Sequence, residues 1–182
     1  MSDGWFILSS NTLKKFKEKY PYVPGRIQWV TLHWSAGNYL NASPKYNFSI
    51  QGDGVILVNP EGPYATLGHT WHRNTGNIGI SCLCMLNAQT PPGSYKPDLK
   101  NWPSCYGPCP PTPAQIKSMI WLCSILLRYF QLSFDCLKTH CDWAEIDEYG
   151  PSFNCERWDW WKEGPIIKAK VKQEYIETKP KK

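Results

Sequence analysis

Short apolar runs, separated by turn-forming residues, fill the first half of the chain and predict β-strands. Residues 27–33 are β-branched and aromatic, which is typical of a buried strand. The runs at 46–50 and 55–58 flank a turn that contains Asp53-Gly54, and an Asp-Gly pair between two apolar runs indicates a hairpin. A further apolar run at 78–85 predicts another buried strand.

The apolar spacing changes to a helical period in the second half of the chain. Thr112 is suited to cap a helix, Pro113 fits its first position, and Gln115 stands where a capping box requires it. Apolar residues then recur at helical spacing, at Ile116, Met119, Ile120, Cys123, Leu126, Leu127 and Phe130. We therefore predict one long helix that packs on the core, a shorter lysine-rich helix over 11–20, and a further strand over 134–139.

The length of 182 residues suits a single domain with a buried core. Residues 86–111 are rich in proline, glycine and polar side chains, and we predict a long loop that is either one wall of a groove or a tolerated insertion. The residues from about 166 onward are predicted to be weakly ordered.

Most of the formal net charge of +5 lies near the C-terminus, where residues 165–182 contain six lysines and two glutamates. A basic tail on a nearly neutral body indicates either contact with an anionic surface or a solvated terminus. No apolar run reaches the roughly 18 residues that a membrane-spanning helix needs. The first residues lack the positive start and apolar run of a signal peptide. We therefore expect a chain that is made and kept in a cytosol until it is released.

Aromatic and cysteine residues are abundant. The chain has ten tryptophans and ten tyrosines, which suit either a groove for sugars and peptides or an aromatic core. Of the eight cysteines, Cys82, Cys84 and Cys123 lie in apolar runs and are predicted to be small core residues. In a reducing cytosol all of them would be thiols.

Two histidines and one aspartate form the candidate reactive centre. His33 ends the strand predicted over 27–33, and ligand chemistry gathers at strand ends in folds that mix strands and helices. His140 follows the segment 134–139, so two neighbouring strand ends would bring both imidazoles to one ion. Asp159 would add a carboxylate from a loop. Two imidazoles and one carboxylate leave a fourth zinc position open for water, so the sequence predicts a metal-dependent hydrolase.

Several short motifs follow one another over residues 27–161. They are Val30–Gly37, Tyr46–Ile50 with the turn Gly52–Gly54, Gly68–Thr70 with Asn74–Ser81, Thr112–Gln115, Thr139–His140, Glu145–Pro151 and Arg157–Asp159. This ordered set resembles the zinc-dependent N-acetylmuramoyl-L-alanine amidases, the type 2 amidase family that includes many phage endolysins and the peptidoglycan recognition proteins. The resemblance implies an α/β fold, with a central mixed β-sheet flanked by helices in a single amidase/peptidoglycan-recognition-type domain.

The resemblance also divides the chain and assigns metal ligands. We expect an N-terminal entry segment over 1–26, a zinc amidase catalytic domain over 27–163 and a basic C-terminal tail over 164–182. His33 and His140 match the two histidine ligands of the family. The third ligand in the family is Asp or Cys. Here it is assigned to Asp159, with Cys155 as the rival, because the basic residue that often precedes the ligand in the family matches Arg157.

The remaining predicted site residues also come from the resemblance. Tyr46 and Arg157 are the predicted catalytic residues, because their side chains can stabilise negative charge on the oxygen of an attacked carbonyl. His69, Asn74 and Trp34 are predicted to line the substrate groove.

The resemblance does not assign the proton-transfer group, because the sequence departs from the family at one position. Ser81 stands near the position where the family often has a carboxylate, and a serine cannot serve as the base. Tyr46 acting through water and Glu145 are the two candidates for protonating the leaving amine.

The implied function is hydrolysis of the bond between N-acetylmuramic acid and L-alanine in bacterial peptidoglycan, with Zn²⁺ as cofactor. We expect a monomeric, phage-type endolysin with no nucleic-acid partner, held in the host cytoplasm until release. Two alternatives within the family are a non-catalytic peptidoglycan-binding module and a cytosolic amidase that recycles wall fragments. A cysteine hydrolase that pairs Cys141 or Cys155 with His33 or His69 is a further alternative.

Overall fold

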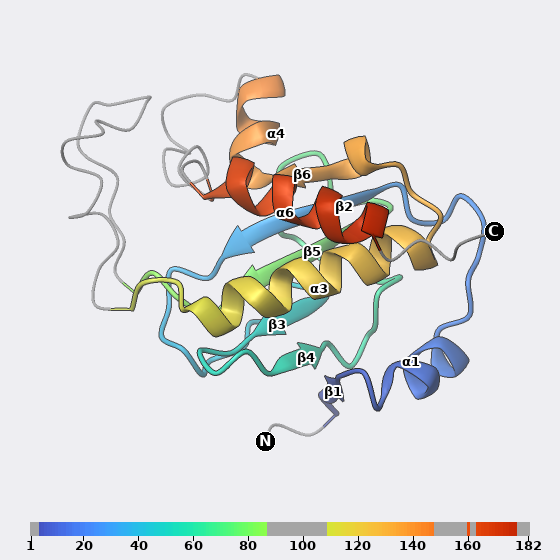
Figure 1. Cartoon of the computed structure of the whole chain (residues 1–182), viewed down its shortest axis with the longest axis horizontal. Coiled ribbons are helices and arrows are strands. Elements are labelled where there is room, and N and C mark those ends of the chain that lie inside the picture. Colours follow the sequence, from blue (N-terminus) through green and yellow to red (C-terminus); the bar gives the residue numbers. More distant parts are fainter. Residues whose placement is uncertain (1–3, 87–108, 148–159, 161–162, 178–182) are drawn as a thin grey trace.

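The computed structural model describes residues 4–86, 109–147, 160 and 163–177. Within these residues a mixed six-stranded β-sheet forms the centre of the molecule, in the order β1-β4-β3-β5-β2-β6 (Figure 1). The strands are β1 (Phe6–Leu8), β2 (Trp29–Trp34), β3 (Phe48–Ile50), β4 (Ile56–Val58), β5 (Asn77–Cys82) and β6 (Leu137–Thr139). The helices are α1 (Leu13–Lys19), α3 (Pro113–Tyr129), α4 (His140–Ile146) and α6 (Gly164–Glu177). The predicted α/β fold with a mixed sheet is therefore confirmed.

The centre of the sheet is parallel and one side of it is antiparallel. Strand β2 runs parallel to both β5 and β6, and β3 runs parallel to β5. Strand β4 is antiparallel to β3 and β1, so β3 and β4 form the predicted hairpin. Its turn uses Gly54 at a φ of +88°, a conformation that L side chains rarely adopt, and the Asp53 carboxylate accepts the Val55 N–H at 3.0 Å.

The two faces of the sheet differ in chemistry because successive side chains of a strand point to opposite sides. On one face Val30 and Leu32 are fully buried in the apolar core, which α3 and α6 cover (Figure 1). On the other face Thr31 and His33 are also fully buried, but they lie among polar groups. Helix α4 lies on this second face, where the Trp143 indole donates to the Thr31 hydroxyl at 2.9 Å. The polar face is the one that can hold a reactive centre.

Helix α3 begins as the sequence predicts. The Thr112 hydroxyl accepts the Gln115 N–H, and the Gln115 side chain accepts the Thr112 N–H, each at 3.0 Å. The buried Gln115 amide also donates to the carbonyls of Ile50 and Leu83, at 3.0 and 2.9 Å. This side chain therefore joins the start of α3 to the sheet as well as capping the helix.

The C-terminal region differs from its prediction. Residues 164–177 form helix α6 rather than a weakly ordered segment. Ile167 and Val171 are 1% and 0% exposed and belong to the main core, so burial of apolar area against α3 stabilises the helix. The sequence of α6 had suggested a solvated tail, because two apolar residues among several lysines give too weak a pattern to predict a packed helix. The division of the chain at residues 26 and 163 stays a prediction.

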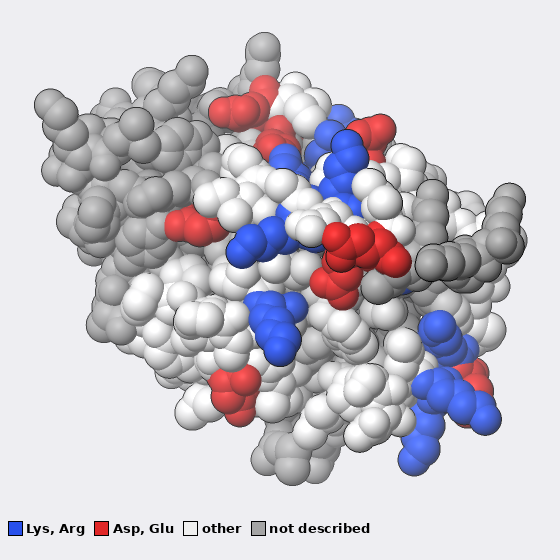
Figure 2. Space-filling view, in the orientation of Figure 1, with Lys and Arg blue, Asp and Glu red and all other residues white. Residues whose placement is uncertain are grey.

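Charges of both signs are scattered over the α3 and α6 side of the molecule (Figure 2). Lys168 pairs with Asp142 of α4 at 2.7 Å, and Glu174 and Glu177 lie on the same helix as the lysines. Contact of the C-terminal lysines with an anionic surface stays a prediction. No helix in the described part of the chain is long and apolar enough to cross a membrane.

Several other predictions can be compared with the structure. The short helix over 11–20 is α1, and the strands predicted over 27–33 and 78–85 are β2 and β5 with shifted ends. The segment 134–139 begins with a 3-10 turn, and only its last three residues form strand β6. Cys82, Cys84 and Cys123 are fully buried, and no disulfide joins any two of the six described cysteines. Most of the loop predicted over 86–111 lies outside the described residues.

Candidate metal and catalytic site

Two neighbouring parallel strands bring His33 and His140 together. His33 is the penultimate residue of β2, and Leu32 beside it pairs with Thr139, the last residue of β6. The chain turns into α4 at His140 because Thr139 and Asp142 form a capping box, with hydrogen bonds of 2.7 and 3.0 Å. The expected placement of both histidines at adjacent strand ends is therefore confirmed.

The two imidazoles face each other through the same kind of nitrogen. Nδ1 of His33 lies 3.1 Å from Nδ1 of His140, and the ring centroids are 4.6 Å apart. Both side chains are buried, at 0% and 6% exposed. Two zinc ligands at the usual Zn–N length on a tetrahedron would be separated by about 3.3 Å. The observed separation therefore fits two neighbouring ligands of one zinc ion.

His69 meets the opposite nitrogen of His33. Its Nδ1 lies 3.1 Å from Nε2 of His33, and its Nε2 lies 3.2 Å from the carbonyl oxygen of Asn77. Because His69 and His140 contact different sides of the His33 ring, the three histidines do not surround one point. Accordingly, no group of three or more His, Cys, Asp or Glu side chains among the described residues is arranged to hold a metal ion.

Burial keeps His33 and His69 neutral. Loss of hydration lowers the pKa of His33 well below its usual 6.5, and the neighbouring His140 and His69 lower it further. Burial also lowers the pKa of His69 to about 4, although its hydrogen bond to the Asn77 carbonyl acts in the opposite direction. Neutral imidazole is the form that binds zinc, so the site presents its nitrogens in the required state.

Tyr46 lies beside the histidines, as the motif resemblance implies. It precedes β3 and is half-buried, with its ring centroid 5.1 Å from that of His33 and 6.4 Å from that of His69. A phenol hydroxyl in this position can donate to a group that gains negative charge near the histidines.

The structure describes the residues that bear on proton transfer. Ser81 pairs with His33 in the register of β5 and β2 and is fully buried, so a serine and not a carboxylate stands next to this histidine. Glu145 is exposed on α4. The choice between Tyr46 and Glu145 stays open.

The loop between β4 and β5 that carries His69 is fastened at two places. The Asn74 side-chain oxygen accepts the N–H groups of His69 and Thr70 at 3.0 and 2.8 Å. Arg73 forms a two-pronged ion pair with Asp147, at 2.9 and 2.6 Å, and its guanidinium lies 4.7 Å from the centroid of the Trp143 ring. These contacts join the loop to α4, the helix that begins with His140.

A surface cavity of about 490 Å³ opens at this loop and reaches His69. It is lined by Gly68, His69, Thr70, Trp71, His72 and Asn74. The Trp71 side chain is 51% exposed, and it was not singled out from the sequence because nothing distinguishes it from the other tryptophans. An exposed indole beside a cavity offers a flat apolar surface to a ligand.

The other predicted site residues include one that points away from the two histidines and several that lie outside the described residues. Trp34 is 7% exposed and lies on the apolar face of the sheet, with its ring centroid 6.2 Å from that of Trp160. Its contact with substrate stays a prediction, as do those of His69 and Asn74. Asp159, its rival Cys155, and Arg157 lie outside the described residues. Cys141, the candidate nucleophile of the alternative hydrolase, is buried at 4% exposed.

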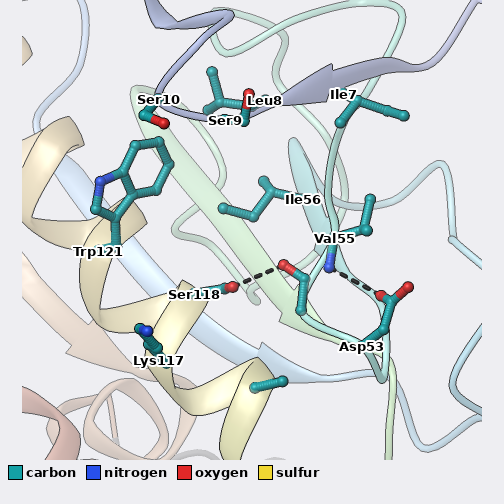
Figure 3. A pocket seen from close by; sticks show the side chains of 12 residues that line it. Ile7, Leu8, Ser9, Ser10, Asp53, Val55, Ile56, Lys117, Ser118 and Trp121 are labelled. Atoms are coloured by element: carbon teal, nitrogen blue, oxygen red, sulfur yellow. Dashed lines mark hydrogen bonds between the residues drawn. The ribbon is translucent and has the colours of Figure 1, made fainter.

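A second cavity, of about 590 Å³, lies between α3 and the strands β1 and β4 (Figure 3). Its wall combines the Trp121 indole with the polar side chains of Asp53, Lys117 and Ser118. The Ser118 hydroxyl donates to the Gly54 carbonyl at 2.7 Å, which ties the hairpin turn to α3. None of the four histidines of the chain lines this cavity. The metal-binding chemistry of the described residues is thus gathered at the other face of the sheet.

Comparison with known proteins gives one family and several structural neighbours. The model of a family described as N-acetylmuramoyl-L-alanine amidase matches residues 23–153, which confirms the resemblance drawn from the motifs. No curated protein matches the chain. One solved structure similar to it is the N-acetylmuramoyl-L-alanine amidase LysC from Clostridium intestinale, with 22% identity and a TM-score of 0.44 over 65% of this chain and 72% of that one. Another is the Drosophila peptidoglycan recognition protein PGRP-SA, with 16% identity and a TM-score of 0.44 over 70% of this chain and 81% of that one.

Proposed function

The chain belongs to the N-acetylmuramoyl-L-alanine amidase family, and we propose that it hydrolyses the amide between N-acetylmuramic acid and L-alanine of peptidoglycan with zinc as cofactor. The observation that carries the zinc proposal is the pair of buried Nδ1 atoms, on His33 and His140, that lie 3.1 Å apart. Their separation fits two ligands of one zinc ion, and burial favours the neutral form of the His33 imidazole that such an ion requires.

His33 and His140 would hold the ion, and Asp159 is the proposed third ligand. A zinc ion lowers the pKa of a bound water to about 7 and polarises a carbonyl, which is the chemistry that amide hydrolysis needs at neutral pH. Two neutral imidazoles and one carboxylate leave the ion with a net positive charge, which favours an anionic transition state.

Tyr46 is proposed to stabilise the oxygen that becomes negative when the amide carbonyl is attacked. Its half-buried ring lies beside His33, so its hydroxyl can donate to that oxygen without first being ordered. Arg157 is proposed as a second donor on the basis of the motif resemblance alone. Trp71 and the cavity that reaches His69 would then contact the substrate beyond the reacting bond.

The proposal extends to an endolysin role, in which the protein acts on the bacterial wall after release from a cytoplasm. A non-catalytic peptidoglycan-binding module is the second candidate within the family. The pairing of the two Nδ1 atoms favours the enzyme, because a binding module has no use for two buried ligands at zinc spacing.

The test measures bound zinc and release of free stem peptide from purified peptidoglycan by the full chain. The parent is expected to hold about one zinc ion per chain and to release peptide, as a single open site requires. His33→Ala and His140→Ala should lose both properties. His72→Ala is the matched control for metal binding, because His72 is exposed, and it should leave the bound zinc unchanged. A parent that binds peptidoglycan without zinc or hydrolysis would instead be a binding module.

A further inference from the structure

His69 occupies a position in which each ring nitrogen has a defined partner. Its Nε2 faces the carbonyl oxygen of Asn77 at 3.2 Å, and its Nδ1 faces Nε2 of His33 at 3.1 Å. The side chain is 7% exposed, so protein groups rather than water satisfy both nitrogens. The donor and acceptor roles of the ring nitrogens can therefore be assigned by starting from the Asn77 carbonyl and proceeding through His69 to His33.

The Asn77 carbonyl sets the direction of the hydrogen bonds. A carbonyl oxygen only accepts, so Nε2 of His69 carries the proton, and in a neutral imidazole Nδ1 is then an acceptor. Nε2 of His33 must donate to it, which leaves Nδ1 of His33 unprotonated, with its lone pair as an electron donor. That lone pair is on the atom that faces His140.

The Thr70 hydroxyl is compatible with the same assignment. Its oxygen lies 2.9 Å from Nδ1 of His69 and 3.4 Å from Nε2 of His33. A hydroxyl can donate to the first nitrogen while it accepts from the second. In either arrangement Nε2 of His33 is the donor, so the lone pair of His33 stays at Nδ1.

The fold fixes the His69 ring in place. Gly79 of β5 lies directly beneath it, and a Cβ there would come within 2.7 Å of the ring. Asn77 is held in turn, because its side chain accepts from the Thr31 hydroxyl at 2.9 Å and donates to the Arg73 carbonyl at 2.6 Å. The carbonyl that directs the hydrogen bonds and the surface under His69 thus belong to one rigid strand.

We propose that His69 is a positioning residue, which orients His33 and fixes its tautomer so that Nδ1 presents its lone pair to the metal ion. This inference rests on the proposed function only in naming zinc as that ion. The Asn77 carbonyl, His69 and His33 form a relay of hydrogen bonds behind the ligand. Partners of this kind behind a metal-bound histidine raise its basicity and restrict its rotation. His69 therefore acts on the metal through His33.

The first test determines the tautomer of His33 without any metal. Nitrogen-15 NMR of the zinc-free parent at neutral pH distinguishes a protonated ring nitrogen from an unprotonated one. The proton of His33 is expected on Nε2, with Nδ1 unprotonated. A proton on Nδ1 would overturn the proposal. This result does not depend on amidase activity, so it separates failure of the relay from failure of the proposed function.

The second test measures the zinc dissociation constant by competition with a chromophoric chelator. His69→Phe keeps a flat ring over Gly79 but offers no acceptor, and it should weaken zinc binding by about 10–100-fold. His69→Asn should recover most of the loss, because its side-chain oxygen can replace Nδ1 as the acceptor. His72→Asn is the control at the exposed histidine and should bind zinc as the parent does.

The outcomes separate a positioning role from direct contact with substrate. If His69→Phe raises KM while the zinc dissociation constant stays at the parent value, His69 only contacts substrate and the proposal is wrong. If His69→Phe does not fold, the tautomer of the parent and the His69→Asn affinity decide. Equal loss of zinc affinity in His69→Asn and His69→Phe would also contradict the relay, because the acceptor would then make no difference.

Discussion

Arg73 and Asp147 form a two-pronged ion pair, with bonds of 2.9 and 2.6 Å, between residues 74 positions apart in the chain. The pair connects the loop that carries His69 to the end of α4, the helix that begins with His140. The hydrogen bond from Arg73 holds the pKa of Asp147 below its usual range, which indicates that the carboxylate is stabilised in its charged form.

Removal of this pair should destabilise the fold modestly. Exposed ion pairs contribute at most about 1 kcal/mol, but this one is two-pronged and its guanidinium also lies over the Trp143 ring. We expect Arg73→Ala to lower the free energy of unfolding by about 1–2 kcal/mol in urea titrations. Lys14→Ala is the control, because its pair with Glu18 is 3.9 Å long and highly exposed, and it should change stability by under about 0.5 kcal/mol. Equal effects of the two substitutions would show that the Arg73–Asp147 pair stabilises the fold no more than an exposed ion pair does.

Adjacent isoleucines in α6 test whether this helix belongs to the core. Ile167 is 1% exposed and Ile166 is 58% exposed. Ile167→Ala should therefore cost about 2–4 kcal/mol of unfolding free energy, because it leaves a cavity between α6 and α3. Ile166→Ala should stay within about 0.5 kcal/mol of the parent. Similar small effects at both positions would mean that the helix is not packed on the sheet in solution.

Tyr46→Phe should separate catalysis from metal binding. The variant keeps the aromatic ring beside His33 but lacks the hydroxyl, so zinc content should be unchanged while kcat on peptidoglycan falls by about 10²–10³-fold. Tyr175→Phe, on α6 and away from the histidines, provides the control for loss of a tyrosine hydroxyl. A variant that loses zinc in proportion to its activity would show that Tyr46 maintains the metal site.

The zinc-free protein should become less stable as the pH is lowered below neutrality. In the unfolded chain His69 takes up a proton near its usual pKa of 6.5, whereas in the folded protein it does so only near 4. Between these values the unfolded state binds more protons, so the free energy of unfolding falls as the pH falls. For His69 alone the loss is on the order of 3 kcal/mol, and His33 adds to it in the same direction.

This pH dependence is measured by urea titrations of the zinc-free protein across the range. His69→Phe should flatten the curve below about pH 6.5, because it removes one of the buried groups that gain protons on unfolding. A parent curve that is flat over this range would show that the histidines are hydrated in solution.

Local features of the sequence were predicted well because their causes are local. The capping box at Thr112, the Asp53-Gly54 turn and the apolar stripe of α3 each depend on residues within one or two turns of each other. The motif order further indicated that His33 and His140 would meet, and their Nδ1 atoms do lie together. In contrast, α6 was missed because its few apolar residues stand among lysines, and only α3 provides the surface that orders them.

The sequence by itself therefore determined the four strands β2 to β5, the long helix, the family and the pair of histidines at the strand ends. Only the tertiary structure decided which groups surround them. His69 lies behind His33 because Gly79 leaves space for its ring, and Arg73 reaches Asp147 because the loop before β5 lies beside the end of α4. Such contacts join residues that are 36 and 74 positions apart, and their geometry follows from packing of the whole sheet, not from any periodic pattern along the chain.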